Sequence, residues 1–320
     1  MEFFQRIGDE VVDQFLRNRD ERNGFLGVEM RQFVSILMPV KNQVAYVGEA
    51  LESVLCSGFE SFEIVVVDGA STDGTIDVLH RYACADARVR WISEPDAGPG
   101  QAVNKALQRS RGTIIGWLNA DDLYAQGAIS RAVDVFSTSA SPVMVYGEAE
   151  HMDEHGQSTG RYPTRTPDTP LQHFQDGCFI CQPTVFFKRT VPLLVGSIDE
   201  TLRTAFDFDY WLRIFKAFPG RIGFVQQIQA KSRWHSAAIS YRMRREVALE
   251  GLSVLSRHLG KAPAHWALTH IDEMKNSQLS DLQGYLAEFL DDVRPYLSDN
   301  DHRWVCRVAT QTCCAPVGAG

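Results

Sequence analysis

Apolar and polar positions change their period repeatedly along the first part of the chain. Short apolar runs, the pattern of strands buried on both faces, alternate with segments whose apolar residues recur at helical spacing. The predicted strands are residues 33–38, 63–67, 89–92 and 113–118, and the helices that follow them are residues 46–57, 76–84, 101–109 and 128–136. Strands that alternate with helices form a mostly parallel sheet through right-handed crossovers. The pattern therefore predicts an α/β fold.

The rest of the chain mixes strands and helices and then becomes helical. Strands are predicted at residues 143–146, 182–187 and 222–228, loops or a hairpin at 147–170, and a helix at 206–218. Helical spacing dominates from residue 239, with one apolar stripe made of Leu279, Leu282, Leu286, Phe289, Leu290 and Val293. We expect three parts: an amphipathic helix docked on the body (1–32), an α/β domain (33–240), and a helical extension with a loose tail (241–320). The extension packs either on the sheet or on another subunit.

Composition adds limits on the class of protein. With 44% apolar and 22% charged residues among 320, the chain is typical of a globular protein with a sizeable core. A net charge of −8 argues against nucleic acid as a partner. No apolar run reaches the length of a membrane span, and the start lacks the basic and apolar segments of a signal peptide. We therefore expect a cytoplasmic protein, with peripheral association at the inner face of the membrane as an alternative.

The seven cysteines are irregularly spaced and do not form the pattern of a disulfide framework. Cys178 and Cys181 have the CxxC spacing, and Cys313 and Cys314 are the residues that would complete a zinc site. The second half of such a site lacks a defined spacing. Buried thiols are the favoured interpretation.

Acidic residues follow three of the predicted strands. Asp121 and Asp122 come after the strand at 113–118, and Asp68 and Asp96 follow two others in loops that contain glycine. Ligands bind at the carboxyl ends of strands in open α/β sheets. Paired carboxylates attract a hard divalent cation, which in turn attracts phosphates. We expect a nucleotide site at this edge; helix capping is the alternative interpretation of each acid.

Six motifs between Val34 and Ser240, about two thirds of the chain, resemble those of glycosyltransferase family 2 and keep the family's order. They are Ile36–Asn42, Val65–Thr75, Ser93–Gly98, Ala102–Lys105, Leu118–Asp122 and Phe206–Arg213. The subgroup that they resemble contains bacterial transferases of surface-polysaccharide synthesis. The resemblance implies the GT-A fold, a Rossmann-like and mostly parallel sheet flanked by helices, here with a C-terminal helical extension.

The resemblance also implies the reaction. A sugar moves with inversion from a nucleotide-diphosphate donor, UDP-sugar being favoured, to a hydroxyl of a carbohydrate, lipid-linked or protein acceptor, with Mn²⁺ or Mg²⁺ as cofactor. The residues that it assigns to nucleotide-sugar binding are Pro39, Val40, Asn42, Asp68, Ser71, Asp96, Gly98, Asn104, Lys105, Asn119 and Asp121. Among them Asp68 accepts a hydrogen bond from the base, and Asp121 holds the metal on the diphosphate. Asn119 replaces the first acid of the family's DxD motif, a departure that weakens the electrostatics and leaves an amide for a ribose hydroxyl.

Further residues have two interpretations each. Asp207 matches the general base of the family, with Phe206 in place of the preceding Glu, and Asp209 is the rival two residues on. His235 matches a third metal ligand and is otherwise a structural histidine. Core packing is favoured over sugar stacking for Trp211 and Trp234.

Other classes of protein fit less well. A nicotinamide dehydrogenase needs GxGxxG after the first strand, where this chain has Pro39 to Asn42. A sugar nucleotidyltransferase is expected to have a glycine-rich, arginine-bearing loop there. The remaining alternative is a catalytically idle nucleotide-sugar-binding or scaffold protein of the same fold, which Asn119 and Phe206 favour. The C-terminal helices suggest a homodimer as a further hypothesis.

Overall fold

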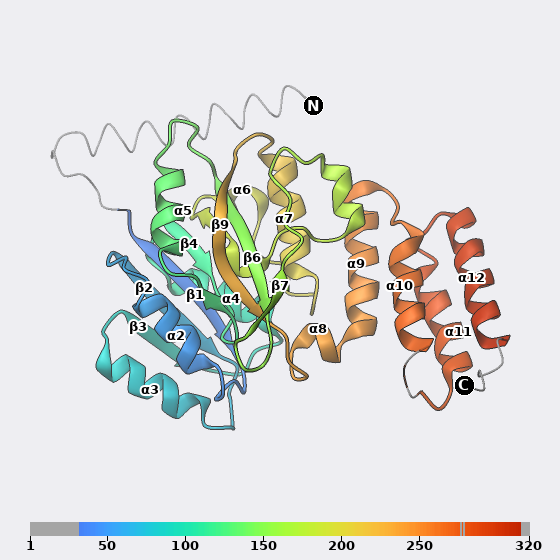
Figure 1. The fold of residues 1–320 in the computed structure, drawn as a ribbon, viewed down its shortest axis with the longest axis horizontal. Helices are drawn as coiled ribbons and strands as arrows, with labels where there is room; N and C mark the ends of the chain where they lie inside the picture. The colour runs from blue at the N-terminus through green and yellow to red at the C-terminus, as the bar shows by residue number, and fades with distance from the viewer. Residues whose placement is uncertain (1–31, 276, 278, 315–320) are drawn as a thin grey trace. The chain divides into compact units, whose positions relative to one another are not determined.

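The computed structural model describes residues 32–275, 277 and 279–314. Figure 1 shows a central sheet with helices on both faces, as the apolar pattern predicts. The amphipathic helix predicted for residues 1–32 lies outside the described residues apart from Gln32. The loose tail predicted from about residue 309 is wrong up to Cys314, because a helix continues to that residue, and residues 315–320 lie outside the described residues.

The sheet formed by the described residues has nine strands. They are β1 (Val34–Val40), β2 (Phe62–Asp68), β3 (Val89–Ser93), β4 (Ile114–Trp117), β5 (Leu123–Tyr124), β6 (Met144–Met152), β7 (Ser158–Arg161), β8 (Phe186–Lys188) and β9 (Ile222–Arg233). Their order is β3-β2-β1-β4-β8-β6-β9-β5, and β7 pairs with β6 as an antiparallel hairpin. The hairpin predicted within residues 147–170 is thereby confirmed.

Apart from a short helix at residues 191–195, which the pattern did not predict, the described helices occupy the predicted segments with small shifts. They are α2 (Val47–Leu55), α3 (Thr75–Ala85), α4 (Pro99–Arg109), α5 (Ala128–Phe136), α6 (Val191–Val195), α7 (Phe206–Ala217), α8 (Ile239–Arg242), α9 (Arg244–Leu259), α10 (Ala264–Lys275), α11 (Leu282–Val293) and α12 (Asp299–Cys314). Two 3₁₀ turns, η1 (Leu171–Asp176) and η2 (Gln182–Thr184), precede β8.

The first half of the sheet is parallel and the second half is mixed. β1 pairs with β2 and β4, and β2 with β3, all in parallel. β8 then joins β4 in antiparallel orientation, and β6 runs antiparallel to β8 but parallel to β9. Strand direction is predictable where a crossover helix links two strands, and the segment between β7 and β8 has only 3₁₀ turns. The strand predicted at 182–187 is correct only in its last part, because η2 with Pro183 occupies its start.

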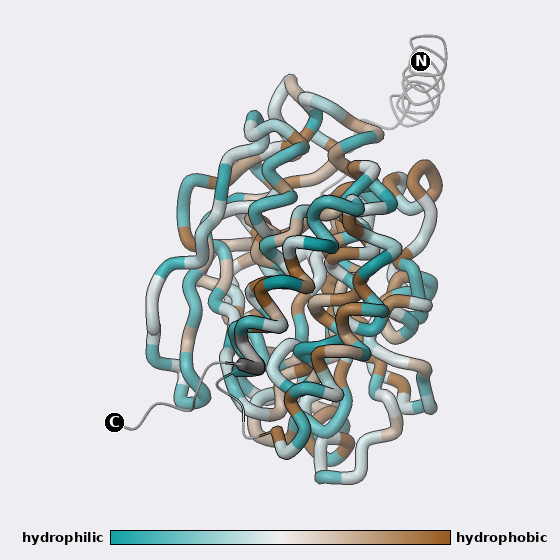
Figure 2. Tube along the Cα trace, turned by 90° about the vertical axis from the view of Figure 1, so that its right-hand side faces the viewer, coloured by the Kyte–Doolittle hydropathy of each residue, from teal (hydrophilic) through white to brown (hydrophobic). Residues whose placement is uncertain are grey.

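Burial on both faces explains the apolar runs. β1 and β2 are buried along their whole length. Ile36 and Met38 pack in the cluster formed with α2, α3 and α5, whereas Leu37 packs in the cluster formed with α4 and α7. Figure 2 shows hydrophobic and hydrophilic stretches that alternate along helices of the described chain, as expected for helices with one buried face. The part of the sheet formed by β1 and β2 is therefore a buried layer between two groups of helices.

The C-terminal helices continue the core on the α7 side. Leu252, Leu286 and Phe289 belong to the same hydrophobic cluster as α7. Glu250 of α9 accepts hydrogen bonds from the backbone N–H groups that precede α7, at 2.7 to 2.9 Å. The extension therefore packs within its own chain, on the α7 layer, and the homodimer stays a prediction. Leu279 was wrongly placed in the apolar stripe, because it precedes α11 and is 42% exposed.

Within the described residues, no helix has both the length and the apolar character needed to cross a bilayer. The cytoplasmic location and the peripheral membrane alternative stay predictions.

Candidate functional site

The carboxyl ends of β1, β2 and β4 meet at one edge of the sheet. Val40 is paired with Asp68, and its carbonyl accepts a hydrogen bond from the Gly69 N–H at 2.9 Å. Asp68 is fully buried, and its carboxylate accepts hydrogen bonds from Ser71 N (3.0 Å), Ser71 Oγ and Ser93 Oγ (2.6 Å). Since a carboxylate has about four acceptor positions, Asp68 has little capacity left, and its direct contact with a base stays a prediction.

Polar side chains join the loop after β1 to the loop after β2. The Asn42 N–H donates to Ser71 Oγ (2.7 Å), and Asn42 Oδ1 accepts from Thr72 N (2.9 Å). Asn42 has a φ of 52°, in the left-handed region that Asn tolerates better than most residues. Pro39 and Val40 come directly before this contact. The backbone predicted to contact the nucleoside is thus held in place from both loops.

Asp96 lies against the backbone of the loop after β2. A Cβ on Gly69 would come within 2.6 Å of Asp96 Oδ2, so a glycine is needed for this approach. The Gly98 N–H donates to Asp96 Oδ1 at 3.0 Å. Burial raises the pKa of Asp96, and this effect outweighs the lowering by the Gly98 hydrogen bond and by the charges of Lys41 and Lys105. Asp96 therefore retains a proton more readily than an exposed carboxyl.

Asn104 and Lys105 of α4 hold neighbouring loops. Asn104 is buried; its amide donates to Ile198 O (3.0 Å) and Glu200 Oε1 (2.7 Å) and accepts from Ile198 N (3.1 Å). Lys105 Nζ donates to Pro95 O at 3.0 Å. These contacts give Asn104 the role of fixing the loop before α7, and contact of Asn104 or Lys105 with a nucleotide sugar stays a prediction.

Asn119 is held on both sides by the protein. Its Oδ1 accepts from Trp117 Nε1 (3.1 Å), and its Nδ2 donates to Gln182 Oε1 (2.8 Å). Gln182 Nε2 in turn donates to Trp117 O at 2.8 Å. The amide that replaces the first acid of the DxD motif therefore fastens η2 to the end of β4, and its bond to a ribose hydroxyl stays a prediction.

Asp121 and Asp122 have different surroundings. Asp121 Oδ2 lies 3.0 Å from His235 Nε2, and the Asp121 side chain is 18% exposed. Asp122 is buried, and its Oδ1 accepts from Arg233 N at 2.9 Å. Burial, and then the negative charge of Asp121, raise the pKa of Asp122 well above its ordinary value. Asp121 is thus the accessible carboxylate of the pair, and Asp122 joins the end of β4 to β9.

Arg233, to which the sequence pattern assigns no role, orders this region. Its side chain is 1% exposed; Nε donates to Asp121 O (2.9 Å), and the guanidinium pairs with Glu49 (2.7 Å). The guanidinium lies 4.7 Å from the ring centroid of Tyr46, which packs on His235 with 4.8 Å between centroids. One buried arginine thereby positions both the Asp121 backbone and the His235 ring.

Asp207 lies in the first turn of α7, which packs against the end of β4. Phe206 stacks on Trp117 with ring centroids 5.7 Å apart and planes at 20°. Asp207 is half-buried and accepts a hydrogen bond from Phe208 N at 2.7 Å. Burial raises the pKa of Asp207 to about 6. A carboxylate with this pKa exchanges its proton near neutral pH, which is the property that a general base needs.

Asp209 is engaged in an ion cluster. It is buried and accepts hydrogen bonds from Arg213 Nε and His258 Nε2, each at 2.8 Å. Burial by itself raises the pKa of Asp209, but the His258 hydrogen bond and the Arg213 charge outweigh it and lower the pKa. Asp209 therefore joins α7 to α9, and of the two acids Asp207 is the more available for proton transfer.

Asp121 and His235 are suitable ligands for a divalent cation. Carboxylate oxygen and imidazole nitrogen both bind Mn²⁺, and Mg²⁺ is commonly held by one or two carboxylates together with substrate phosphates. In the described part of the chain, no three His, Cys, Asp or Glu side chains gather as a ready metal site. A cation between Asp121 and His235 therefore needs further ligands, and the oxygens of a diphosphate have the required chemistry.

Comparison with known families agrees with the motifs. Residues 35–191 match the family model described as glycosyl transferase family 2. The chain contains a glycosyltransferase family 2 domain. An uncharacterized glycosyltransferase of Rickettsia conorii is 27% identical to it over 279 residues, which cover 83% of this chain and 42% of the relative. Chondroitin synthase of Escherichia coli is 29% identical over 189 residues, 58% of this chain and 27% of the synthase. The chain thus spans less than half the length of these relatives.

Solved structures of low sequence identity have the same fold as this glycosyltransferase domain. Staphylococcus aureus TarS 1–349 in complex with UDP-GlcNAc superposes with a TM-score of 0.58 at 15% identity, covering 88% of each chain. The mannosyltransferase PcManGT of Pyrobaculum calidifontis, in complex with GDP-Man and Mn²⁺, gives a TM-score of 0.56 at 18% identity, covering 90% of this chain and 82% of the other. The predicted GT-A fold is confirmed.

The predictions for the tryptophans and cysteines have different outcomes. Trp211 is fully buried, as predicted, but Trp234 is 65% exposed, so core packing was the wrong prediction for it. The reason is that β9 ends at Arg233 and the chain leaves the sheet there.

Cys181 is buried, and burial raises the pKa of the Cys178 and Cys181 thiols, which disfavours the thiolates that zinc requires. The side chains of Cys313 and Cys314 lie outside those described.

The two neighbouring acids of α7 should affect stability in opposite directions. Because the folded-state pKa of Asp207 is raised to about 6, its ionised form destabilises the fold above that pH. Asp207→Asn should therefore increase the free energy of unfolding at pH 8 by up to about 3 kcal/mol and change it little at pH 4. Urea unfolding at the two pH values measures the difference.

Asp209→Asn is the matched control. The lowered pKa of Asp209 contributes stability above its unfolded value, and this contribution is lost as the pH falls through the folded pKa. The variant should therefore be less stable than the wild type at pH 8. Equal shifts of both variants in the same direction would contradict the assignment of the two environments.

Proposed function

We propose that the domain is an inverting, metal-dependent glycosyltransferase that moves a sugar from a UDP-sugar to a hydroxyl of a surface polysaccharide or glycoconjugate. The observation that carries the proposal is the position of Asp207, whose pKa burial raises to about 6. Asp207 lies in the first turn of α7, which packs on Trp117 at the end of β4. The loop after β4 carries Asp121, which contacts His235. Relatives named for chondroitin synthesis and for teichuronic acid biosynthesis support the class of acceptor. Neighbours bound to UDP-GlcNAc and GDP-Man support a nucleotide-diphosphate donor.

Donor binding would use the sheet edge. The ordered loops that contain Asn42 and Asp96 would enclose the nucleoside, and Asp121 and His235 would hold a divalent ion against the diphosphate. When bound, this ion offsets the negative charge that develops on the leaving diphosphate. Arg233 keeps Asp121 and His235 in register without contacting the donor, because its own side chain is buried.

Asp207 would act on the acceptor. Its carboxylate takes the proton of the attacking hydroxyl as that oxygen bonds to the anomeric carbon, on the face opposite the leaving diphosphate. The bond from the anomeric carbon to the phosphate oxygen breaks as the new bond forms, so the configuration inverts. The sugar has oxocarbenium character on the way, as in glycoside hydrolysis. Base catalysis of this kind contributes roughly 10²–10⁴-fold.

The idle alternative is less well supported. Asn119 and Phe206, the two departures that favour it, both make structural contacts with Trp117. A half-buried Asp207 with a raised pKa costs stability and has no structural partner that explains it among the described side chains. Strongly perturbed carboxylates of this kind are typical of functional sites.

Asp207→Asn should lower kcat for sugar transfer by roughly 10²–10⁴-fold, because the base is lost. The Kd for UDP should remain that of the wild type, and the wild-type pH profile should have an acidic limb near pH 6. Steady-state transfer assays and calorimetry measure both. The exposed Asp134→Asn on α5 serves as a matched control and should behave as wild type. Loss of UDP binding in Asp207→Asn would assign this residue to the donor site instead.

Asp121→Ala should abolish the dependence of UDP binding on Mn²⁺, because a charged ligand of the ion is removed. Asp122→Asn is the control: the neighbouring carboxyl is buried with a raised pKa, so an amide should preserve the Mn²⁺ dependence. Titration of UDP with and without Mn²⁺ distinguishes the two variants. An Asp121→Ala protein that binds UDP and Mn²⁺ as the wild type does would exclude Asp121 as a metal ligand.

A further inference from the structure

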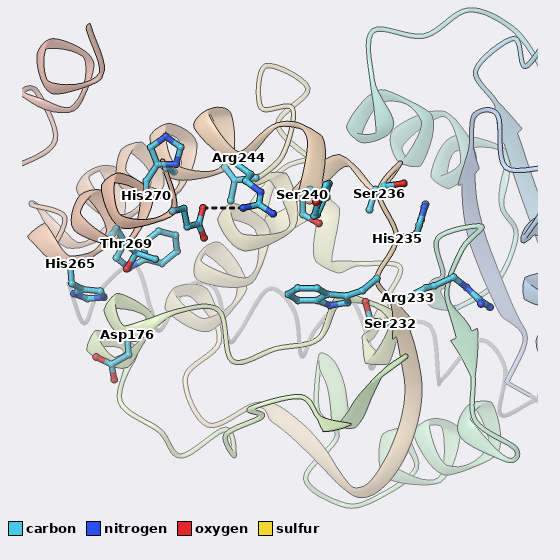
Figure 3. Close-up of a pocket in the computed structure, with 17 residues that line it drawn as sticks. Asp176, Ser232, Arg233, His235, Ser236, Ser240, Arg244, His265, Thr269 and His270 are labelled. Atoms are coloured by element: carbon cyan, nitrogen blue, oxygen red, sulfur yellow. Dashed lines mark ion pairs between the residues drawn. The ribbon is translucent and has the colours of Figure 1, made fainter. Parts of the chain in front are cut away.

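A pocket of about 700 Å³ lies between the end of β9 and the C-terminal helices. Figure 3 shows Arg233 and His235 at its end nearest the sheet, His265 and Asp176 at the other end, and Arg244 between them. Its volume falls in the range of small-molecule binding sites. Because His235 lines it, the pocket begins beside the residues proposed to hold the donor diphosphate.

Trp234 presents an exposed but fixed aromatic surface in this pocket. The side chain is 65% exposed, although an indole in water is unfavourable. Its Nε1–H donates to His151 Nδ1 at 2.9 Å, and the two rings meet edge to face with 5.2 Å between centroids. The ring is therefore held in one orientation with most of its surface uncovered.

Two further rings support Trp234. His151 packs on Tyr162, with 5.1 Å between ring centroids. The Tyr162 hydroxyl in turn donates a hydrogen bond to Cys178 O at 2.7 Å, which fixes the second ring. Trp234 is thus held in place by two successive ring contacts.

The charges that line the pocket are paired with one another or with neighbours. Arg244 lies 3.9 Å from Glu273 and covers the ring of Tyr241, itself 52% exposed, at 4.6 Å. Arg233 is paired with Glu49, and Asp176 with Arg165 at 2.8 Å. A ligand would therefore meet aromatic surface and hydrogen-bonding groups with little net charge.

We propose that this pocket binds the acceptor, a neutral oligosaccharide that stacks one sugar ring on Trp234. The inference rests on the proposed glycosyltransferase function and adds the acceptor's class and position. A sugar ring has an apolar C–H face that an aromatic ring covers and hydroxyls that hydrogen-bond around its rim. Because His235 lines the same pocket, a sugar stacked on Trp234 lies beside the place proposed for the donor diphosphate.

Calorimetry on the full chain, with UDP and Mn²⁺ present, tests the proposal with chitotetraose and maltotetraose as neutral probes. An acidic tetrasaccharide of uronic acid and hexosamine is the comparison. At least one neutral probe should bind the wild type more tightly than the acidic one. Its Kd should rise about tenfold in Trp234→Ala, since burial of one sugar face is worth roughly that factor. Trp234→Phe should restore most of the affinity.

Trp304→Ala is the matched control, because Trp304 is also an exposed tryptophan, at 46%, but lies on α12 and does not line the pocket. It should bind the probe as the wild type does, and all variants should keep the wild-type Kd for UDP. The proposal is overturned if a wild type that binds UDP binds neither neutral probe, prefers the acidic one, or loses nothing in Trp234→Ala. A wild type that fails to bind UDP or any other nucleotide sugar contradicts the proposed function instead.

Discussion

The contact between the end of β9 and the loop that follows β4 is the constraint on which the site depends. Asp122, buried with a raised pKa, accepts the Arg233 N–H, and the Arg233 side chain reaches back to the Asp121 carbonyl. These contacts join segments more than a hundred residues apart and bring His235 to Asp121. Because the constraint uses one acid of the adjacent pair, the other remains accessible for chemistry.

The C-terminal helices take part in the same arrangement. Glu250 caps the backbone before α7, and His258 binds Asp209 inside it, so α9 fixes the helix that carries Asp207. Two acids only two residues apart have opposite pKa shifts: His258 and Arg213 lower the pKa of Asp209, whereas burial raises the pKa of Asp207. A structural carboxylate and the proposed base thus share one helical turn, and α9, which fixes that helix, also contributes Val247 and Ala248 to the pocket.

The sequence is sufficient to predict the strands of the parallel half of the sheet, because strands buried on both faces appear as unbroken apolar runs such as Val65–Val67. It also identifies Asp121 and Asp207 as candidates through motifs at strand and helix ends. The mixed half of the sheet, the exposure of Trp234 and the contacts of Arg233 depend on how distant segments pack, which local periodicity does not encode. Glu250 looks like any exposed helical acid in the sequence, and only the packing of α9 on α7 gives it a role.

The most direct measurement is a crystal structure of the full chain with UDP and Mn²⁺, with the metal located by its anomalous signal. The central claim is that Asp121, His235 and Asp207 surround one bound nucleotide. The account predicts an Mn²⁺ peak within coordination distance of the Asp121 carboxylate and the His235 ring, with Asp207 facing the space beyond the β-phosphate. A nucleotide bound elsewhere, or a metal held without Asp121, would contradict it.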